Sequence, residues 1–337
     1  MRRRFMSSKN IGSDASVPMY IEALTDNVTV SLSTNDVEYS LDGRTWKTLA
    51  ADTESPSINT GDRIYFKGDL THRLFNNVGT FTISNTCDIG GNIMSLLFKE
   101  NFEDAYDLSD HESVFEELFS DCSTINSAAN LILPATILAP SCYSMMFYRC
   151  TGLTQAPELP ATTLDQDCYY GMFSCCSSLI QAPKLPATIL ADHCYSGMFE
   201  SCISLKQAHE LPATELTPYC YVNMFRGCTG LTQAPELPAT TLDKYCYYYM
   251  FRDCTGLTQA PELPATTLAD CCYQNMFNKC SNLKYIKMLA TDIIASSCLH
   301  NWVSGVASSG TFVKSKDATW SVTGNSGIPS GWTVETV

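Results

Sequence analysis

A single pattern of apolar and polar residues recurs along the centre of this chain. The segment Leu-Pro-Ala-Thr begins six times at a constant 26-residue interval, at Leu133, Leu159, Leu185, Leu211, Leu237 and Leu263. Two columns of cysteine keep the same interval, one from Cys142 to Cys298 and the other from Cys150 to Cys280. Copies of constant length without insertions predict a solenoid, in which each coil buries its apolar side chains against the next.

Each unit divides into two halves of different character. In the first half, apolar residues recur mostly at intervals of three or four, at Leu138, Cys142, Met146, Phe147 and Cys150. This spacing places them on one stripe of a helix with about 3.6 residues per turn. We therefore expect helical turns that face the core.

The second half, from Leu153 to Pro160, has the character of a short strand. Pro157 and Pro160 have no N–H to donate to a β-ladder, so pairing must end near the first of them. We expect about three or four paired residues per coil, with strands roughly 4.8 Å apart. If the opposite side were α-helical, it would be wider than the strand side, and the array would curve with its strands on the concave face.

Residues 18–99 predict a small all-β, sandwich-like domain. Apolar residues alternate with polar ones in several short runs, which is typical of half-buried strands. These apolar positions are Val28, Val30 and Leu32, then Val37, Tyr39 and Leu41, then Ile64 and Phe66, then Phe81 and Ile83. The pair Asp42-Gly43 is a two-residue hairpin signal between two of these runs.

The composition changes again after this domain. From Glu100 to Asp121 there are nine acidic residues and no lysine or arginine, which favours a solvated linker or cap face over an interaction tail. A degenerate repeat at Phe119–Cys122 lies two residues out of phase, as expected of a terminal coil. We therefore predict an α+β solenoid protein. Its segments are a flexible basic N-terminus (1–17), the β domain (18–99), an acidic linker and N-terminal cap coil (100–132), the solenoid (133–294) and a C-terminal cap (295–337).

The repeat resembles a known family. The sequence Cys-Thr-Gly-Leu-Thr-Gln-Ala-Pro, with a following half that contains Met-Phe-x-x-Cys, is similar to the leucine-rich repeats of BspA-like bacterial surface proteins. The resemblance covers residues 115–294, with a 26-residue unit that is longer than is usual in that family, and with prolines at strand positions. It implies a non-catalytic adhesion or recognition scaffold.

Charge and hydropathy narrow the set of partners. The 337 residues include 21 Lys and Arg against 35 Asp and Glu, and the resulting net charge of -14 repels a polyanion such as nucleic acid. No apolar run approaches the roughly 18 residues that a membrane-spanning helix needs. The basic start, Met1 to Asn10, has no apolar stretch behind it. We expect no nucleic-acid partner, no membrane insertion and no secretion signal.

The 17 cysteines are expected to be buried, reduced thiols that act as small apolar side chains. Cys142 and Cys150 would lie about 12 Å apart along a helix, beyond the roughly 4.4–6.8 Å that a disulfide spans. Zinc prefers close pairs such as C-x₂-C, whereas these spacings alternate between eight and eighteen residues. A structural role for the Cys150 column would be hydrogen bonding to loop carbonyl groups. We expect no metal site and no cofactor.

The chain carries no recognisable catalytic motif. Its five histidines share no metal or nucleophile pattern, and neither G-x-S-x-G, H-E-x-x-H nor a phosphate-binding glycine loop is present. The row of mostly glutamates from Glu158 to Glu262 could supply paired carboxylates, but a surface column is the simpler interpretation. His209 replaces a proline of the other units and is interpreted as drift at a solvent-facing position. We expect no catalytic residue and no enzyme activity.

Two columns of side chains are candidates for a partner-binding face. One consists of Gln155, Gln181, Gln207, Gln233, Gln259 and Tyr285. Its stacked amides can form a hydrogen-bonded ladder along the array, or the column can line the face that meets a partner. The other column runs from Tyr143 to Tyr273, with further tyrosines near 245–249. It is either half-buried packing with hydroxyls at the rim or a contact surface for protein or glycan.

These features favour a non-catalytic binding or adhesion protein that presents its repeat face to a protein or glycan. The alternative is a structural or appendage protein of a bacterial surface or a phage particle, which also accounts for a surface-type repeat without a secretion signal. The expected location is the cell surface or the extracellular space, with the virion or the cytoplasm as alternatives.

Overall fold

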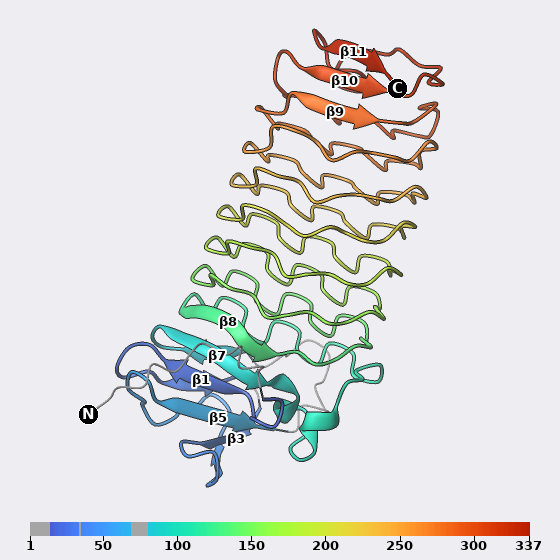
Figure 1. Cartoon of the computed structure of the whole chain (residues 1–337). Helices are drawn as coiled ribbons and strands as arrows, with labels where there is room; N and C mark the ends of the chain where they lie inside the picture. Colours follow the sequence, from blue (N-terminus) through green and yellow to red (C-terminus); the bar gives the residue numbers. More distant parts are fainter. Residues whose placement is uncertain (1–13, 34, 69–79) are drawn as a thin grey trace, which may run out of the picture.

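The computed structural model is a column of stacked coils on an N-terminal β unit (Figure 1). It describes residues 14–33, 35–68 and 80–337, so most of the expected basic segment 1–17 lies outside the described residues. The described part contains strands and two short 3₁₀ helices but no α-helix. The elements are β1 (Tyr20–Ala23), β2 (Val30–Leu32), β3 (Val37–Ser40), β4 (Lys47–Leu49), β5 (Arg63–Lys67), β6 (Phe81–Ile83), β7 (Cys87–Asn92), η1 (Ile93–Leu96), η2 (Phe102–Asp104), β8 (Ile125–Ile132), β9 (Tyr285–Met288), β10 (Thr311–Lys314) and β11 (Thr333–Thr336).

The N-terminal unit contains two sheets that share one core. The larger sheet has the strand order β4-β3-β5-β1-β7-β8, and β2 pairs with β6 in a separate two-stranded sheet. The ring of Phe81 in β6 packs edge-on against Phe66 in β5, with centroids 5.2 Å apart. The described residues of this region therefore form strands in two sheets, followed by the short η1 helix.

The hairpin predicted at Asp42-Gly43 forms, but its turn is longer than two residues. β3 ends at Ser40 and β4 begins at Lys47, and the two strands are antiparallel. The Asp42 carboxylate accepts hydrogen bonds from the backbone N–H groups of Arg44 and Thr45 at 2.8 and 2.7 Å. The aspartate side chain thus closes a wider loop, in the manner of an Asx turn.

A shared sheet joins the N-terminal unit to the solenoid. β7 pairs in parallel with β8, the first strand of the stack. Gly91 in β7 has φ +77°, and a Cβ there would collide with the carbonyl oxygen of Pro18. Glycine is required because the chain before β1 passes directly over this position. The hydrophobic core is continuous from the β unit into the coils.

The half of each coil that was predicted to be helical is a train of four-residue turns. The N–H of Tyr143 donates to the carbonyl of Cys168 in the next coil at 3.0 Å, whereas the N–H of Ser144 donates back to Ser141 at 3.0 Å. This alternation continues in the following coils, so some N–H groups link coils and others close turns. Every fourth residue is left-handed, as at Ser141, Met145 and Arg149 with φ 54°, 52° and 58°.

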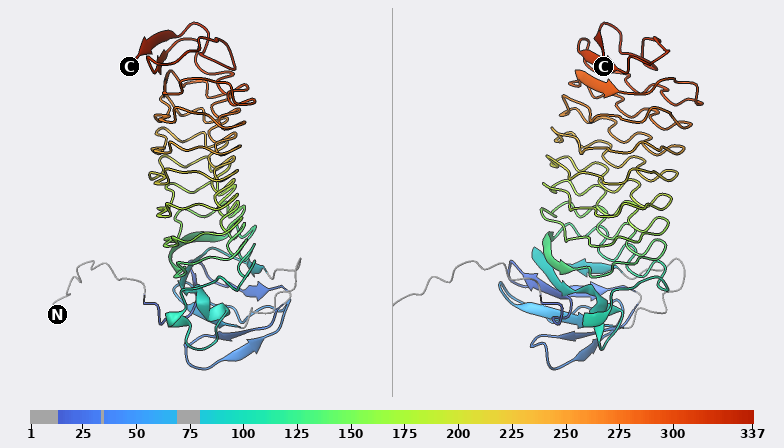
Figure 2. Two further views of the ribbon diagram at one scale, coloured as in Figure 1. Left: turned by 90° about the vertical axis from the view of Figure 1, so that its right-hand side faces the viewer. Right: turned by 45° about the vertical axis from the view of Figure 1, so that its right-hand side comes forward.

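The helical interpretation is therefore wrong, although the side-chain pattern behind it is correct. A train of four-residue turns also brings every fourth side chain inward, and Leu138, Cys142, Met146 and Cys150 are all buried. An α-helix is about 10 Å wide and uses its N–H groups internally, so it cannot stack at a strand spacing of about 4.8 Å. The spacing between coils is therefore similar on the strand side and on the turn side. The column is nearly straight (Figure 2).

The strand side pairs over fewer residues than expected. In the central coils the pairing is reduced to isolated parallel bridges, such as Gln181 with Gln207 and Gln207 with Gln233. Among the described residues, ladders of four or more pairs within the stack occur at its ends, between β7 and β8 and from β9 to β11. The Ala-Pro and Leu-Pro steps explain the difference, because each proline removes a donor from the ladder.

Two columns of aromatic rings fill the solenoid. The phenylalanines from Phe119 to Phe277 stack with centroids 5.4–5.7 Å apart. The tyrosines from Tyr143 to Tyr273 stack at 5.7–5.9 Å, and the rings of both columns are 0–1% exposed. Phe119 stacks on Phe147, two positions beyond one repeat length, so the first coil has the predicted phase shift.

The cysteines contribute to the same core. All 17 are free, and all but Cys175 are buried. In the Cys150 column each thiol donates to the carbonyl of a phenylalanine in the preceding coil at 2.9–3.1 Å. The predicted bond from thiol to loop carbonyl is therefore confirmed. Burial raises the pKa of these thiols, and that of Cys168 in the other column to about 12.

A C-terminal cap closes the stack. β10 and β11 extend the parallel sheet that begins at β9. The indole of Trp302 follows the last rings of both aromatic columns, 6.3 Å from Tyr273 and 6.1 Å from Phe277. The indole N–H groups of Trp302, Trp320 and Trp332 donate to backbone carbonyls at 2.8, 3.0 and 2.7 Å. These bonds satisfy the polar atoms of side chains that cover the apolar end of the last repeat.

Candidate partner-binding face

The glutamine column lies on the strand side of the solenoid. Its glutamines are exposed, and Tyr285, within β9, is half-buried; the members in order are Gln155, Gln181, Gln207, Gln233, Gln259 and Tyr285. Gln207 forms backbone bridges with Gln181 below it and Gln233 above it. The structure therefore brings the predicted column together on one face.

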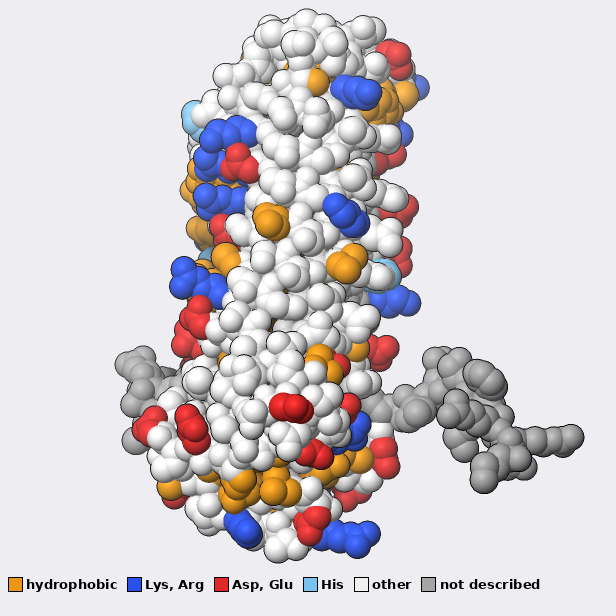
Figure 3. All heavy atoms as spheres, turned by 90° about the vertical axis from the view of Figure 1, so that its left-hand side faces the viewer, with side chains coloured by type: hydrophobic (Ala, Val, Ile, Leu, Met, Phe, Trp, Pro, Cys, Tyr) orange, Lys and Arg blue, Asp and Glu red, His pale blue; other side chains and the backbone are white. Residues whose placement is uncertain are grey.

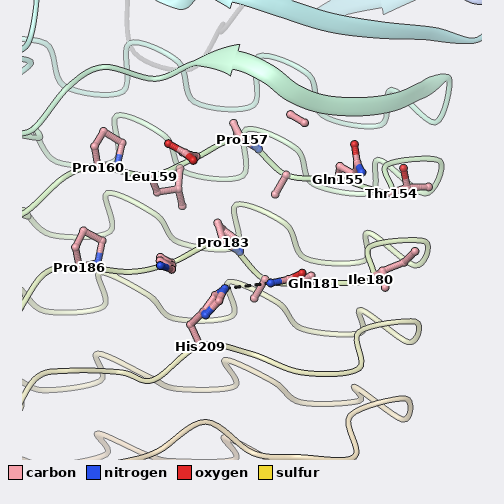
Figure 4. A pocket seen from close by; sticks show the side chains of 15 residues that line it. Thr154, Gln155, Pro157, Leu159, Pro160, Ile180, Gln181, Pro183, Pro186 and His209 are labelled. Atoms are coloured by element: carbon pink, nitrogen blue, oxygen red, sulfur yellow. Dashed lines mark hydrogen bonds between the residues drawn. The ribbon is translucent and has the colours of Figure 1, made fainter. Parts of the chain in front are cut away.

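The amides of this column do not form a ladder among the described residues. Gln155 accepts a hydrogen bond from the Ser127 hydroxyl at 3.1 Å. The amide nitrogen of Gln181 instead approaches Nε2 of His209 at 3.2 Å (Figure 4). Gln207, Gln233 and Gln259 make no side-chain hydrogen bond to any described residue. Their donors and acceptors are available to a partner.

Three shallow hollows follow the glutamine column along the stack. From the N-terminal end their volumes are about 690, 600 and 770 Å³. The first and second share Lys184 and His209, and the second and third share Gln233. We call this continuous depression, lined mainly by residues 154–264, the Gln groove.

The Gln groove has apolar surfaces between polar side chains. Ala-Pro pairs, such as Ala156-Pro157 and Ala234-Pro235, are buried or half-buried in it. The exposed glutamines precede these pairs and the exposed Glu158 row follows them. Sequence reasoning treated the prolines only as strand breakers and missed the hollows. The available signal was an alanine and a proline between two longer polar residues in four of the five coils, with His209 in place of the proline in the other.

The charged row beside the groove is mostly acidic. Lys184 is followed by Glu210, Glu236 and Glu262, all exposed. Lys287 pairs with Glu262 at 2.9 Å, whereas Glu210 and Glu236 form no ion pair with any described residue. Two unpaired carboxylates, those of Glu210 and Glu236, therefore stand beside the central part of the groove, where Lys184 and Lys206 are the exposed cations.

His209, which the sequence interprets as drift at a solvent-facing position, lies in the wall of the groove. The side chain is half-buried, lines two of the hollows and contacts the Gln181 amide. Neither nucleophile nor carboxylate is bonded to its ring within the described residues. Its imidazole therefore forms part of the wall where the first and second hollows meet.

The tyrosine column from Tyr143 to Tyr273 cannot meet a partner. The prediction of hydroxyls at the rim is wrong, because the four-residue turn directs two successive side chains inward, such as Cys142 and Tyr143. The other two side chains of a turn, such as those of Tyr148 and Arg149, lie nearer the solvent. Several buried hydroxyls lack a hydrogen-bond partner among the described residues, namely those of Tyr143, Tyr221, Tyr247 and Tyr273.

No group of three or more His, Cys, Asp and Glu side chains in the described ranges is arranged to hold a metal ion. The cysteine columns run through the core rather than around a cavity, with their thiols directed at backbone carbonyls in the Cys150 column. The side chains with open donors and acceptors are those of the Gln groove.

The comparisons with known proteins yield one distant likeness. No family model and no curated protein matches this chain. A leucine-rich cell surface protein from Faecalibacterium prausnitzii, known from its crystal structure, is similar over 85% of each chain, with 12% identity and a TM-score of 0.26. At this score the likeness assigns no role to any residue of the groove. Within the described residues, no helix is long and apolar enough to cross a membrane.

Proposed function

We propose that this protein is a non-catalytic binding protein of the bacterial surface whose Gln groove holds an extended segment of a partner protein. The observation that carries this proposal is the coincidence of three linked hollows with a column of exposed, unbonded amides. An amide side chain can donate to and accept from a peptide backbone at the same time. The resemblance of the repeats to BspA-like surface proteins supports the location.

The dimensions of the groove suit an extended chain. The hollows extend over five coils, from the coil of Thr154 to that of Pro264. At about 4.8 Å per coil this is roughly 20 Å, the length of about six residues of extended peptide at about 3.3 Å each. Such a segment could meet several glutamines in turn, while its apolar side chains contact the Ala-Pro pairs.

The lining favours a peptide over a glycan in this groove. No Phe, Tyr or Trp lines any of the three hollows. Sugar rings therefore find no aromatic surface, whereas Ala, Pro and Leu offer shallow contacts for aliphatic side chains. The unpaired carboxylates of Glu210 and Glu236 favour a segment with basic side chains.

A displayed library of short random peptides tests this proposal with the full-length chain. We expect selection of extended peptides that carry lysine or arginine. In the double variant Gln207→Ala/Gln233→Ala, the loss of two hydrogen bonds of about 1 kcal/mol each should weaken the selected peptides about thirtyfold. Gln274→Ala, the same substitution on the turn side of the coil, is the matched control and should leave binding unchanged.

Two outcomes would overturn the proposal. One is a library from which no peptide is selected at micromolar affinity. The other is a set of peptides that bind the double variant and the wild-type chain equally well. Circular dichroism of both variants establishes that a loss of binding is not a loss of structure.

A further inference from the structure

A second cluster of side chains lies on the turn side of the solenoid, away from the Gln groove. We call it the aromatic edge, and its rings are those of His193, Tyr219, Tyr245, Tyr248 and Tyr249. His193 stacks on Tyr219 with centroids 4.6 Å apart, and Tyr219 stacks on Tyr245 at 4.9 Å, with interplanar angles of 6° and 7°. All five rings are half-buried, unlike the fully buried rings of the core.

Backbone preference does not explain these residues. His193, Tyr219, Tyr245 and Tyr249 have φ between 57° and 59°, a left-handed conformation that bulky side chains rarely adopt. In other coils the place of the first three is taken by smaller residues, at Ser141, Asp167, Cys271 and Ser297. The left-handed backbone recurs every fourth residue in this fold, so what sets these three residues apart is a ring at a place where other coils have a smaller side chain.

The rings of the aromatic edge have two different orientations. In the stack of His193, Tyr219 and Tyr245, each ring covers the facing side of its neighbour. A partner can therefore reach the edges of these rings but not the faces between them. Tyr248 is turned by 82° to Tyr245 and by 68° to Tyr249, with centroids 5.5 and 4.1 Å away. The plane of the Tyr248 ring is therefore steeply inclined to the planes of the stacked rings, so its faces do not point toward the neighbouring coils.

Charged side chains of both signs surround these rings. The Arg252 guanidinium lies 4.9 Å from the Tyr249 ring centre, and the Lys244 amine lies 5.9 Å from that of Tyr219. Arg252 is paired with Asp253 at 3.2 Å, as Arg226 is with Glu200. Basic side chains gather with hydrophobic ones along one edge of the solenoid in Figure 3. Since the guanidinium groups are paired, the cluster offers donors and acceptors without a large excess of either charge.

We propose that the aromatic edge binds a neutral, hydroxyl-rich glycan chain. Sugar hydroxyls donate and accept, so they suit paired carboxylates and guanidinium groups better than a polyanion does. The C–H faces of sugars pack on aromatic rings, and Tyr248 provides such a ring between two others. The stacked rings of His193, Tyr219 and Tyr245 run along three consecutive coils, so an extended polymer that lies along the stack would meet them in turn. It is separate from the Gln groove and does not depend on the function proposed for it.

Binding of defined glycans to the full-length chain tests this inference by titration calorimetry. The probes are soluble mannan, xylan and mixed-linkage β-glucan, with polygalacturonate and polyglutamate as acidic counterparts. The test variant is Tyr245→Ser/Tyr248→Ser, which introduces the residue found at the same places in other coils, at Ser141 and Ser144. Tyr170→Ser is the matched control, since Tyr170 occupies the repeat position of Tyr248 outside the cluster.

We expect at least one neutral glycan to bind, with an affinity that changes little with salt and falls tenfold or more in the double serine variant. Tyr170→Ser and Gln207→Ala/Gln233→Ala should bind that glycan like the wild type. The inference is overturned if no neutral glycan binds, if the double serine variant binds equally well, or if binding is confined to the two acidic polymers. If the double variant misfolds, Tyr248→Ser alone supplies the same comparison.

Discussion

Removal of one ring from the phenylalanine column should destabilise the whole solenoid. Phe199 lies in the middle of the stack and is 0% exposed. Its ring is 5.7 Å from that of Phe173 below and 5.6 Å from that of Phe225 above, with interplanar angles of 1° and 11°. Phe199→Ala therefore removes two ring contacts and leaves a cavity that connects two coils.

The size of the effect follows from this burial. A phenylalanine side chain that buries about 200 Å² at about 25 cal/mol per Å² contributes about 5 kcal/mol, which is an upper value. Alanine retains a small part of this, and buried Phe→Ala substitutions generally cost about 3–5 kcal/mol. We expect Phe199→Ala to lower the free energy of unfolding by about 4 kcal/mol.

Denaturation by urea, followed by tryptophan fluorescence, measures this loss. Three of the four tryptophans, Trp302, Trp320 and Trp332, lie in the C-terminal cap, and Trp46 lies in the N-terminal unit. Fluorescence therefore reports on the two ends of the molecule, whereas circular dichroism reports on all coils. Separate transitions by the two probes would show that the coils on either side of position 199 unfold independently, as nearest-neighbour coupling allows.

The exposed residue Ile189, in the same unit, provides the control. Its side chain is 79% exposed, so Ile189→Ala should change the free energy of unfolding by no more than about 0.5 kcal/mol. A loss of less than about 1 kcal/mol for Phe199→Ala would refute the view that stacked rings hold the coils together.

Three further predictions concern the thiols and the absence of catalysis. Cys202→Ala should lower the free energy of unfolding, measured by urea denaturation, by about 1–3 kcal/mol, because the carbonyl of Phe173 loses a buried donor at 3.1 Å. Cys202→Ser keeps a donor and should lower it less. Equal losses in the two variants would count against a stabilising hydrogen bond from the Cys202 thiol. Native protein at about pH 8 should expose only Cys175 to a thiol reagent, since burial raises the pKa of thiols such as Cys168 and keeps them protonated. Unfolding should release all 17, and rapid reaction of several native thiols would contradict this. Soluble glycans and peptides should show no turnover, and turnover abolished by Glu236→Gln would disprove the non-catalytic role.

The stacking of the coils could be predicted because it depends only on the repeat length. A constant 26-residue interval places every cysteine, methionine and phenylalanine of the repeat over its equivalent in the next coil. The burial of Met198 and Phe199 and the bond from Cys202 follow from that alignment. None of this requires the backbone conformation to be known.

The backbone of the turn side could not be derived from apolar spacing, because a helix and a train of four-residue turns bring nearly the same side chains inward. Gly171 and Gly197 did carry a signal, since they occupy the left-handed position that Met145 holds in another coil. The Gln groove was missed because its hollows arise from side chains of adjacent coils. The stacking of His193 on Tyr219 likewise depends on how far one coil lies from the next.

The equal size of the coils has a consequence for how such a protein can change over generations. Deletion or duplication of a whole 26-residue unit would leave each remaining coil with an equivalent neighbour above and below. The caps at both ends would stay as they are, and the column would shorten or lengthen by one rise of about 4.8 Å. Recombination between similar units could therefore adjust the length of the column, and with it the length of the Gln groove, while the fold stays the same.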